Sequence, residues 1–279
     1  MKKIIFTSAI AALSLVSCGE SAEQRAANLL QQADAAYATG NFQSAKIFID
    51  SIRVTYPDVI DVRRKALELK RSVELAEQQR TLDYCRESLA KFEARRDSLL
   101  PSFEYEADKR YQDEGSYIVP SQSLRLNVFN SLLRARVTES GKAYITSVYR
   151  GKRIAHRSVK VSSGESYVSC SEPFMSHTFR NLGVNNERLD FIAGEDGGLM
   201  GFIATAHGPL TVELEGEQGK YSYTLRESDA KAIASVLELS MVLSAIAEFK
   251  EVAAEAERHI TFVEKARERF SRDSISGTK

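Results

Sequence analysis

The stretch Leu237–Ile260, LELSMVLSAIAEFKEVAAEAERHI, determines the fold of the C-terminal part of the chain. Apolar residues recur there every three or four positions, and Arg267 alone interrupts the series Leu239, Val242, Ile246, Phe249, Ala253, Ala256, Ile260, Val263 and Phe270. This spacing places side chains on one face of an α-helix. We therefore expect a long helix over residues 229–272, with Ser228 as its N-cap and residues 273–279 as a disordered tail.

A second long helical pattern precedes the middle of the chain. The segment from residue 58 to about residue 100 contains no glycine, and its leucines repeat at heptad spacing at Leu75, Leu82 and Leu89. Pro101 ends or kinks this helix, within a helical segment that we assign to residues 58–112. A single long helix leaves its stripe of apolar residues exposed to water. We therefore expect the two long helices to pack on each other as an antiparallel, coiled-coil-like stalk. In such a pair the numbers of two residues that face each other would sum to roughly 329, which places Leu82 near Ala247. The alternative is a parallel dimer, in which the apolar stripe of one helix packs against the same stripe of a second copy.

Between these helices, over residues 117–226, the apolar period falls to two. Turn signals rich in glycine separate the short alternating runs, as in Ser140-Gly141, Ser163-Gly164 and His207-Gly208-Pro209. The expected strands are centred on Leu126, Thr146, Val159, Phe191, Phe202, Val212 and Tyr223. The predicted class is α+β, with seven or eight antiparallel strands forming a β-sandwich or open barrel inserted between the two long helices.

Residues 18–57 predict a helical hairpin. Ala33, Gly40, Phe42, Ala45 and Pro57 stand at spacings that resemble one tetratricopeptide repeat. The resemblance implies two closely packed helices. No second copy follows at the repeat period, so a packing module is expected rather than a peptide-binding groove; a docking site is the alternative.

The N-terminus has the features of a secretory signal over residues 1–17. Lys2 and Lys3 precede a short apolar core that ends at Ser17, and no second apolar stretch approaches the length of a membrane-spanning helix. The sequence Leu15-Val16-Ser17-Cys18 resembles the lipobox of bacterial lipoproteins, which implies lipidation of Cys18; an ordinary secretory signal is the alternative.

With its repeat-like start, the chain resembles the lipoproteins of unassigned activity that are common in Bacteroidota. That resemblance implies an outer-membrane lipoprotein that faces the periplasm or the cell surface.

Composition narrows the classes of partner. The chain has 38 basic and 38 acidic residues, and this balance argues against nucleic acid. Cys85 and Cys170 could form a disulfide, but one stands in a helical pattern and the other in a strand pattern, so two buried free thiols are at least as consistent.

The sequence predicts no catalytic residue, metal site or cofactor. His156, His177 and His207 fall in the β region, with Glu165, Glu172, Asp190, Glu195 and Asp196 as possible partners, but no two histidines have the short spacing of metal ligands. The segment Gly194–Gly198 lacks the alternating oxygen ligands of a calcium loop and is interpreted as a hairpin turn.

The least regular segment, residues 172–188, contains Phe174, Met175 and Phe179. These side chains either fill the core or form a contact surface. The expected function is a lipid-anchored, non-enzymatic scaffold or binding module of the cell envelope, with the membrane and a protein or glycan as partners. A hydrolase or ligand-metabolising enzyme with its site in the β domain, and a periplasmic adaptor of an export system, are the alternatives.

Overall fold

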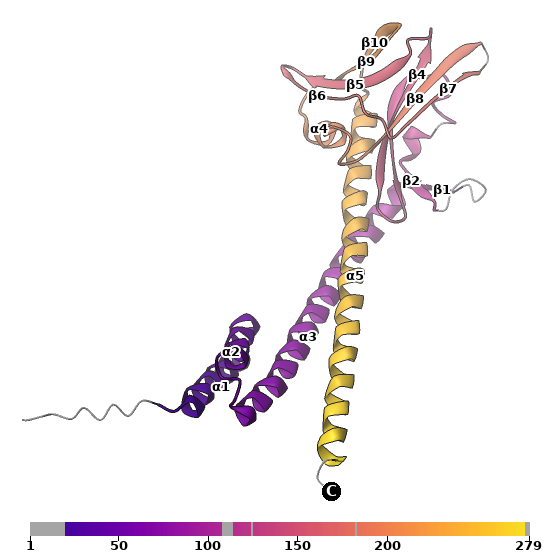
Figure 1. The fold of residues 1–279 in the computed structure, drawn as a ribbon. Coiled ribbons are helices and arrows are strands. Elements are labelled where there is room, and N and C mark those ends of the chain that lie inside the picture. The colour runs from indigo at the N-terminus through magenta and orange to yellow at the C-terminus, as the bar shows by residue number, and fades with distance from the viewer. Residues whose placement is uncertain (1–19, 108–113, 124, 182, 277–279) are drawn as a thin grey trace, which may run out of the picture. The chain divides into compact units, whose positions relative to one another are not determined.

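The structure, a computed structural model, describes residues 20–107, 114–123, 125–181 and 183–276 (Figure 1). The predicted signal peptide and Cys18 lie outside these residues. The chain forms two compact units: Met1–Arg80 with Ala256–Lys279, and Thr81–Glu255. The divisions fall inside the two long helices, α3 (Ile60–Leu99) and α5 (Glu227–Ser276), so each of these helices contributes residues to both units.

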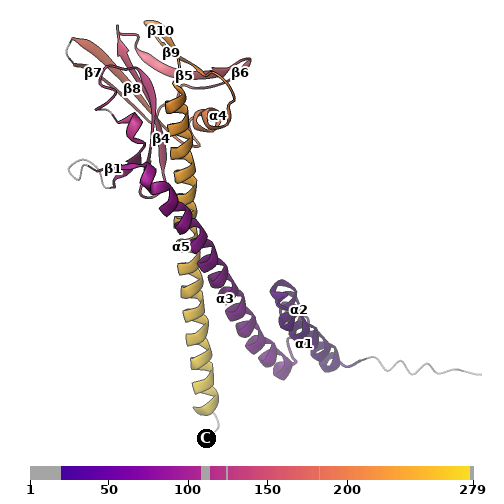
Figure 2. The ribbon, with the colours of Figure 1, turned by 180° about the vertical axis from the view of Figure 1, so that it is seen from behind.

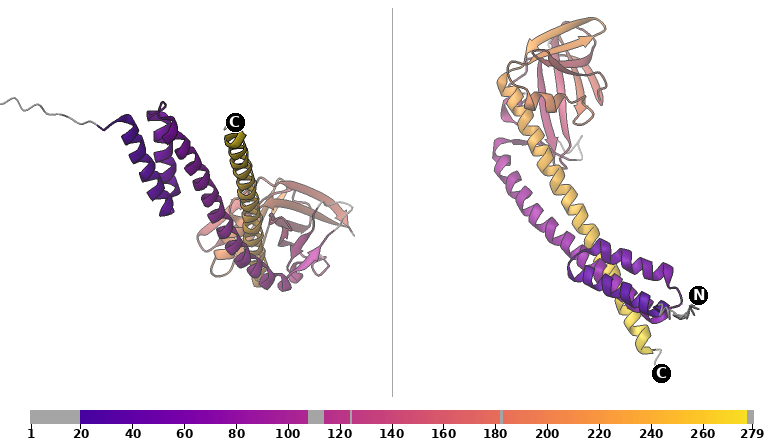
Figure 3. Two further views of the ribbon diagram at one scale, coloured as in Figure 1. Left: turned by 90° about the horizontal axis from the view of Figure 1, so that it is seen from below. Right: turned by 90° about the vertical axis from the view of Figure 1, so that its left-hand side faces the viewer.

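The first unit contains the expected helical hairpin, which consists of α1 (Ala22–Ala38) and α2 (Phe42–Thr55) side by side (Figure 3). Ser21 opens α1 with a capping box, and Asn41 caps α2. Gly40 makes the turn with a φ of +72°, a conformation that glycine adopts without steric cost. Ala33 and Ala45 are fully buried, because their small side chains let the two helices approach closely.

Helix α3 completes the core of the first unit. Val62, Ala66 and Val73 are buried in the same apolar cluster as α1 and α2. Arg80 lies over the Phe42 ring, 4.5 Å from its centroid, and donates a hydrogen bond of 3.2 Å to the carbonyl of Gly40. Within this unit Arg71 of α3 also lies over the ring of Phe270 of α5, so an early residue of α3 meets a late residue of α5.

The second unit contains two antiparallel sheets, which confirms the mixed α+β class. The six-stranded sheet has the order β1 (Glu104–Glu106), β2 (Ser116–Ile118), β3 (Leu132–Thr138), β4 (Ala143–Gly151), β8 (Val184–Ile192) and β7 (Met175–Asn181). The four-stranded sheet has the order β10 (Gly219–Thr224), β9 (Thr211–Gly216), β5 (His156–Ser163) and β6 (Ser166–Cys170). In chain order α3 precedes the sheets and α5 follows them.

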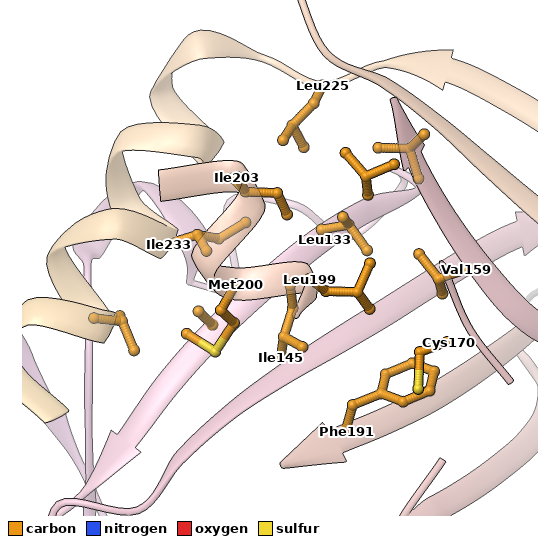
Figure 4. Packing of buried hydrophobic residues seen from close by; sticks show 14 of the residues in the cluster. Leu133, Ile145, Val159, Cys170, Phe191, Leu199, Met200, Ile203, Leu225 and Ile233 are labelled. Atoms are coloured by element: carbon orange, nitrogen blue, oxygen red, sulfur yellow. The ribbon is translucent and has the colours of Figure 1, made fainter. Parts of the chain in front are cut away.

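One apolar core joins both sheets to α5 and to the short helix α4 (Leu199–Thr205), which lies beside α5 (Figures 1 and 2). Figure 4 shows Leu133, Ile145 and Phe191 of the six-stranded sheet near Met200 of α4 and Ile233 of α5. The four-stranded sheet adds Val159, Val161, Val212 and Leu214. The six-stranded sheet therefore packs one face into this core, and we call its opposite face the outer face.

Within the second unit, α3 and α5 meet through long side chains. The Phe249 ring contacts Tyr84 and Phe92 at centroid distances of 5.8 and 5.7 Å. Arg95 pairs with Glu238, and Lys250 Nζ lies 3.6 Å from Glu93. The direction is antiparallel, but the expected register is wrong, because it would place Phe249 near residue 80. Aromatic rings rather than small alanines form this contact, and Ala247 is exposed.

The ends of both long helices differ from the prediction. Helix α3 ends at Leu99 rather than near residue 112, because Pro101 and a short 3₁₀ turn (Leu100–Ser102) lead into strand β1. Helix α5 starts at Glu227, so Ser228 lies inside it and is not its N-cap. The helix continues to Ser276, so residues 273–276 are not a disordered tail, and residues 277–279 lie outside the described part.

Several β-region predictions are also wrong. The described residues form ten strands rather than seven or eight. Residues 125–129 form turns instead of a strand, because the Asn127 side chain donates to the carbonyls of Ser121 and Ser123. Phe202 lies in helix α4, and Gly194–Gly198 leads from a strand into that helix instead of forming a hairpin turn. Asp196 fixes this loop by accepting hydrogen bonds from the backbone N–H groups of Gly198 and Met200.

Two further findings concern the thiols and the membrane. Cys85 and Cys170 are both free and buried, as one of the two sequence alternatives states. Within α5, an apolar window is long and apolar enough to cross a membrane by length and composition alone, contrary to the sequence reading. Ile233, Val236 and Leu239 of this helix are fully buried in the protein core, so its apolar face already has a folded environment.

Gly141 provides a test of how the β3–β4 hairpin packs on α5. Its φ is +91°, its carbonyl accepts a hydrogen bond of 2.6 Å from the Ser240 hydroxyl, and a Cβ there would lie 2.6 Å from the Ser244 nitrogen. Gly164 has a φ of +57° and open space around it, so Gly164→Ala incurs only the left-handed backbone penalty of about 1–2 kcal/mol. Gly141→Ala should cost about 1–3 kcal/mol more, measured by urea denaturation of the full chain. Equal losses would contradict the described contact with α5.

Candidate functional site

The three histidines of the β region lie apart. His156 is buried at the start of β5, His177 is exposed on β7, and His207 is exposed in the segment after α4. Among the described residues no group of three or more histidine, cysteine, aspartate or glutamate side chains could hold a metal ion. The structure thus does not gather these histidines with carboxylates in one cleft.

A buried polar cluster does surround His156, and sequence reasoning missed it. His156 Nε2 lies 3.3 Å from the Ser147 hydroxyl, while Nδ1 has no hydrogen-bond partner in the part of the chain that the structure describes. Burial lowers the pKa of His156 to about 4, against a smaller upward effect of Glu187. The sequence signal is weak, because Glu187 is a single acidic residue that points to the core side in β8.

The Glu187 carboxylate has a structural partner in the backbone. Its oxygens accept hydrogen bonds from the N–H groups of Ile154, Ala155 and His156 at 3.0, 3.3 and 2.6 Å. These bonds hold Ala155 at a φ of +55°, a left-handed conformation that is costly for alanine. Ser147, His156 and Glu187 are 0%, 7% and 2% exposed, so a substrate has no access to them. The cluster fixes a strained loop and does not form a hydrolase site.

Cavities large enough for a small ligand occur in both units. In the second unit a cavity of about 570 Å³ lies between α4, the segment that follows it and the start of α5, and His207 lines it. Its charged residues Glu227 and Lys231 pair with each other at 2.6 Å and are both exposed. In the first unit an apolar groove of about 430 Å³ lies between α2 and α3. The groove also has charged side chains along it, and none of the charged side chains that line either cavity is buried: Asp50, Arg53, Arg63, Arg64 and Lys70 in the groove, and Glu227 and Lys231 in the other cavity.

The outer face of the six-stranded sheet is the most distinctive polar surface in the second unit. Residues opposite each other in an antiparallel pair point to the same face. Arg134 lies opposite Thr146, which lies opposite Asp190, and Asp190 lies opposite Met175. By the same register this face carries Arg136 of β3, Tyr144 and Arg150 of β4, Asn186 and Arg188 of β8, and His177 and Phe179 of β7.

Two of the four arginines on this face have partners. Arg134 is 5% exposed, pairs with Glu106 at 2.7 Å and donates to the carbonyl of Gln122 at 3.1 Å. Arg136 lies over the Tyr144 ring, 4.0 Å from its centroid. Burial lowers the pKa of Arg136, and so do Arg134 and Arg188, while Asp190 opposes them. Asp190 itself accepts a hydrogen bond from the Thr146 hydroxyl.

The other two arginines, Arg150 and Arg188, differ from Arg134 and Arg136 in their lack of partners within the part of the chain that the structure describes. Their Nε atoms are buried and have no hydrogen-bond partner among the described residues. Burial lowers the pKa of Arg150, and the charge of Arg188 lowers it further, which shows that the two cations influence each other. Both side chains are partly exposed, and two neighbouring cations without an anion repel each other unless a ligand neutralises them.

The predicted contact residues lie along the exposed margin of this face. Phe174, Met175 and Phe179 are 59%, 54% and 39% exposed, so the core-filling alternative is wrong for them. The irregular segment is a β7–β8 hairpin, and β7 is the last strand of its sheet with every residue exposed. Phe174 lies against Tyr144, with 6.3 Å between ring centroids, and Lys142 Nζ is 5.8 Å from the Phe174 ring.

The buried His156 predicts how stability depends on pH. Its pKa of about 4 lies below the 6.5 of an exposed imidazole, so the unfolded chain binds a proton that the folded chain does not. The free energy of unfolding should therefore fall by about 3 kcal/mol as the pH falls from about 6.5 to about 4. In urea denaturation, His156→Gln should remove most of this pH dependence of the free energy of unfolding, whereas the exposed control His207→Gln should retain it. A His156→Gln protein with the wild-type slope would refute the assignment.

The chain was also compared with known proteins. No family model, no curated protein and no solved structure matches it. The resemblance to lipobox-bearing envelope proteins stays a prediction from the sequence.

Proposed function

We propose that this chain is a lipid-anchored, non-enzymatic binding protein of the cell envelope. Its binding surface is strand β7 with the adjoining outer face of the six-stranded sheet. The observation that carries the proposal is the exposure of β7, whose seven residues are all exposed beside Phe174. The partner is a protein that contributes an extended, acidic segment.

Strand β7 has the properties of a strand that accepts another strand. It pairs on one side with β8 in continuous register and ends the order of its sheet. The strand contains no proline and Arg180 is its sole permanent charge, so it has few of the features that protect sheet edges. An extended segment can add to such an edge through main-chain hydrogen bonds, with side-chain contacts to Met175 and Phe179 giving specificity.

Charge defines the partner. Around the exposed apolar residues the face carries Lys142, Arg136 and Arg188, and the aspartate opposite Met175 is hydrogen-bonded to Thr146. Acidic side chains on an incoming segment would face these cations. A basic or neutral segment would leave the local positive charge unbalanced, which is why an acidic segment is favoured.

The remaining parts of the proposal concern attachment. Lipidation of Cys18 would hold the chain at the outer membrane, on its periplasmic face or at the cell surface. The antiparallel contacts of α3 with α5 inside each unit support a two-helix stalk, and the α1–α2 hairpin would act as a tetratricopeptide-like packing module. The β domain, which follows α3 and precedes α5 in the chain, would be the part presented to a partner.

The sequence alternatives receive less support. The buried Ser147–His156–Glu187 cluster gives a hydrolase no accessible nucleophile. An export adaptor with a long helical hairpin inserted into a β domain would have the reverse chain order, since here the sheets come between the two long helices. A binding module needs neither a catalytic group nor a different order of elements.

The anchor is tested by replacing the thiol. Cys18→Ala should release the protein from the membrane fraction into the soluble fraction, and the wild-type N-terminal peptide should carry acyl chains in mass spectrometry. Cys85→Ala, at a buried cysteine of α3, is the matched control and should stay with the membrane. A Cys18→Ala protein that remains membrane-bound would contradict the proposed attachment.

The binding surface is tested by site-specific photocrosslinking in cells that express the protein naturally. A photoreactive phenylalanine at position 179 of β7 should capture one acidic, extended segment of one protein. Tyr167 on β6 is the control, because it is an aromatic residue, 62% exposed, on an edge strand of the other sheet.

A synthetic peptide of the captured segment then provides the affinity test. Phe179→Asp should weaken its binding about tenfold or more, and Tyr167→Asp should not change it. Capture of the same proteins from both strands, or of no protein from β7, would sink the protein-partner proposal. In the second case glycans become the next ligands to screen.

A further inference from the structure

We infer that Arg150 and Arg188 form an oxyanion-binding site on the outer face, which takes a phosphate, sulfate or carboxylate group of a ligand. The inference deepens the proposed function, because the site lies on the same face. Its test uses small anions and needs no protein partner, so this site and the β7 contact can fail separately.

Register brings the two arginines together. Val148 of β4 lies opposite Arg188 of β8, and Arg150 of β4 lies opposite Asn186 of β8. The two arginines are therefore diagonal neighbours on one face of a strand pair, at a spacing of roughly 7–8 Å, which long side chains can bridge through a shared ligand. The next strand adds His177 opposite Arg188 and Phe179 opposite Asn186.

The pair lacks a counter-ion of its own. Among the described residues neither guanidinium makes a hydrogen bond or an ion pair, and both Nε atoms are buried. The contrast with Arg134, which has both Glu106 and the Gln122 carbonyl, shows that this face does supply partners where an arginine serves structure alone. Asp190 lies on the same face but is bonded to Thr146 and acts on Arg136.

The chemistry of the two side chains defines the ligand class. A guanidinium is planar and offers its N–H donors in a fixed fork that matches two oxygens of a carboxylate, phosphate or sulfate group. Two such forks on neighbouring strands suit a group with several oxygens and a full negative charge. The Phe179 ring, 39% exposed and 5.4 Å from the His177 ring, offers an apolar contact for whatever carries the anion.

The test titrates the full chain with inorganic phosphate, and separately with acetate, against sodium chloride at equal ionic strength. Calorimetry gives the affinity and differential scanning fluorimetry gives the melting temperature. We expect saturable binding of one anion per chain and a rise in melting temperature that chloride does not reproduce. Tighter binding of phosphate would assign a phosphate or sulfate ester as the natural group, and tighter binding of acetate would assign a carboxylate.

The variants separate binding from folding. Arg150→Gln and Arg188→Gln should each weaken anion binding about ten- to a hundredfold, and each should raise the melting temperature without anion, because the repulsion between two neighbouring cations is removed. The control Arg157→Gln removes the same charge from an exposed ion pair with Glu217 on the other sheet and should keep wild-type affinity.

Three results would overturn the site: equal responses to phosphate, acetate and chloride, wild-type anion affinity in both variants, or a lower melting temperature of both variants without anion. The last result would show that the arginines serve packing.

Discussion

Burial of the apolar face of α5 is the constraint on which the second unit depends. Ile233, Val236 and Leu239 are fully buried against both sheets and α4. That core uses one face of the six-stranded sheet, so every second residue of its strands points to the other face. Arginines can therefore stand at alternate positions of β3, β4 and β8 without entering the apolar core. The proposed binding surface thus results from the packing of the opposite face of the six-stranded sheet into the apolar core.

The two faces use charge in different ways. On the core side the Glu187 carboxylate accepts hydrogen bonds from backbone N–H groups of the loop that contains the strained Ala155, and burial lowers the pKa of His156. On the outer face Arg134 has partners within the protein, whereas the Nε atoms of Arg150 and Arg188 have none among the described residues. Arg150 and Arg188, whose Nε atoms have no partner among the described residues, stand on β4 and β8, and β8 pairs with the exposed strand β7. This division is what links the oxyanion site to the strand-addition surface.

Regular periodicity explains which parts of the fold could be predicted. The long helices and strands β5, β8 and β9 each bury mainly one stripe or face, so their apolar residues repeat at the helical or strand period. Strand β7 buries neither face and therefore has no alternation, and α4 is too short for its period to differ clearly from that of a strand. The arginine pair could not be predicted, because only the register of β4 with β8 brings Arg150 close to Arg188. The exposure of Phe174, Met175 and Phe179 could not be predicted either, because apolar residues in an irregular segment fit core filling as well as a contact surface.

The central claim is that the β7 margin of the outer face is occupied in the envelope. Hydrogen–deuterium exchange most directly tests it, by comparing the protein extracted from its native membrane in mild detergent with the same protein purified alone. The account predicts slower exchange of the β7 amides in the extracted protein, with unchanged exchange in β6 and β10, which are the edges of the other sheet. Equal exchange of β7 in both samples, or slowing confined to β6 or β10, would contradict it.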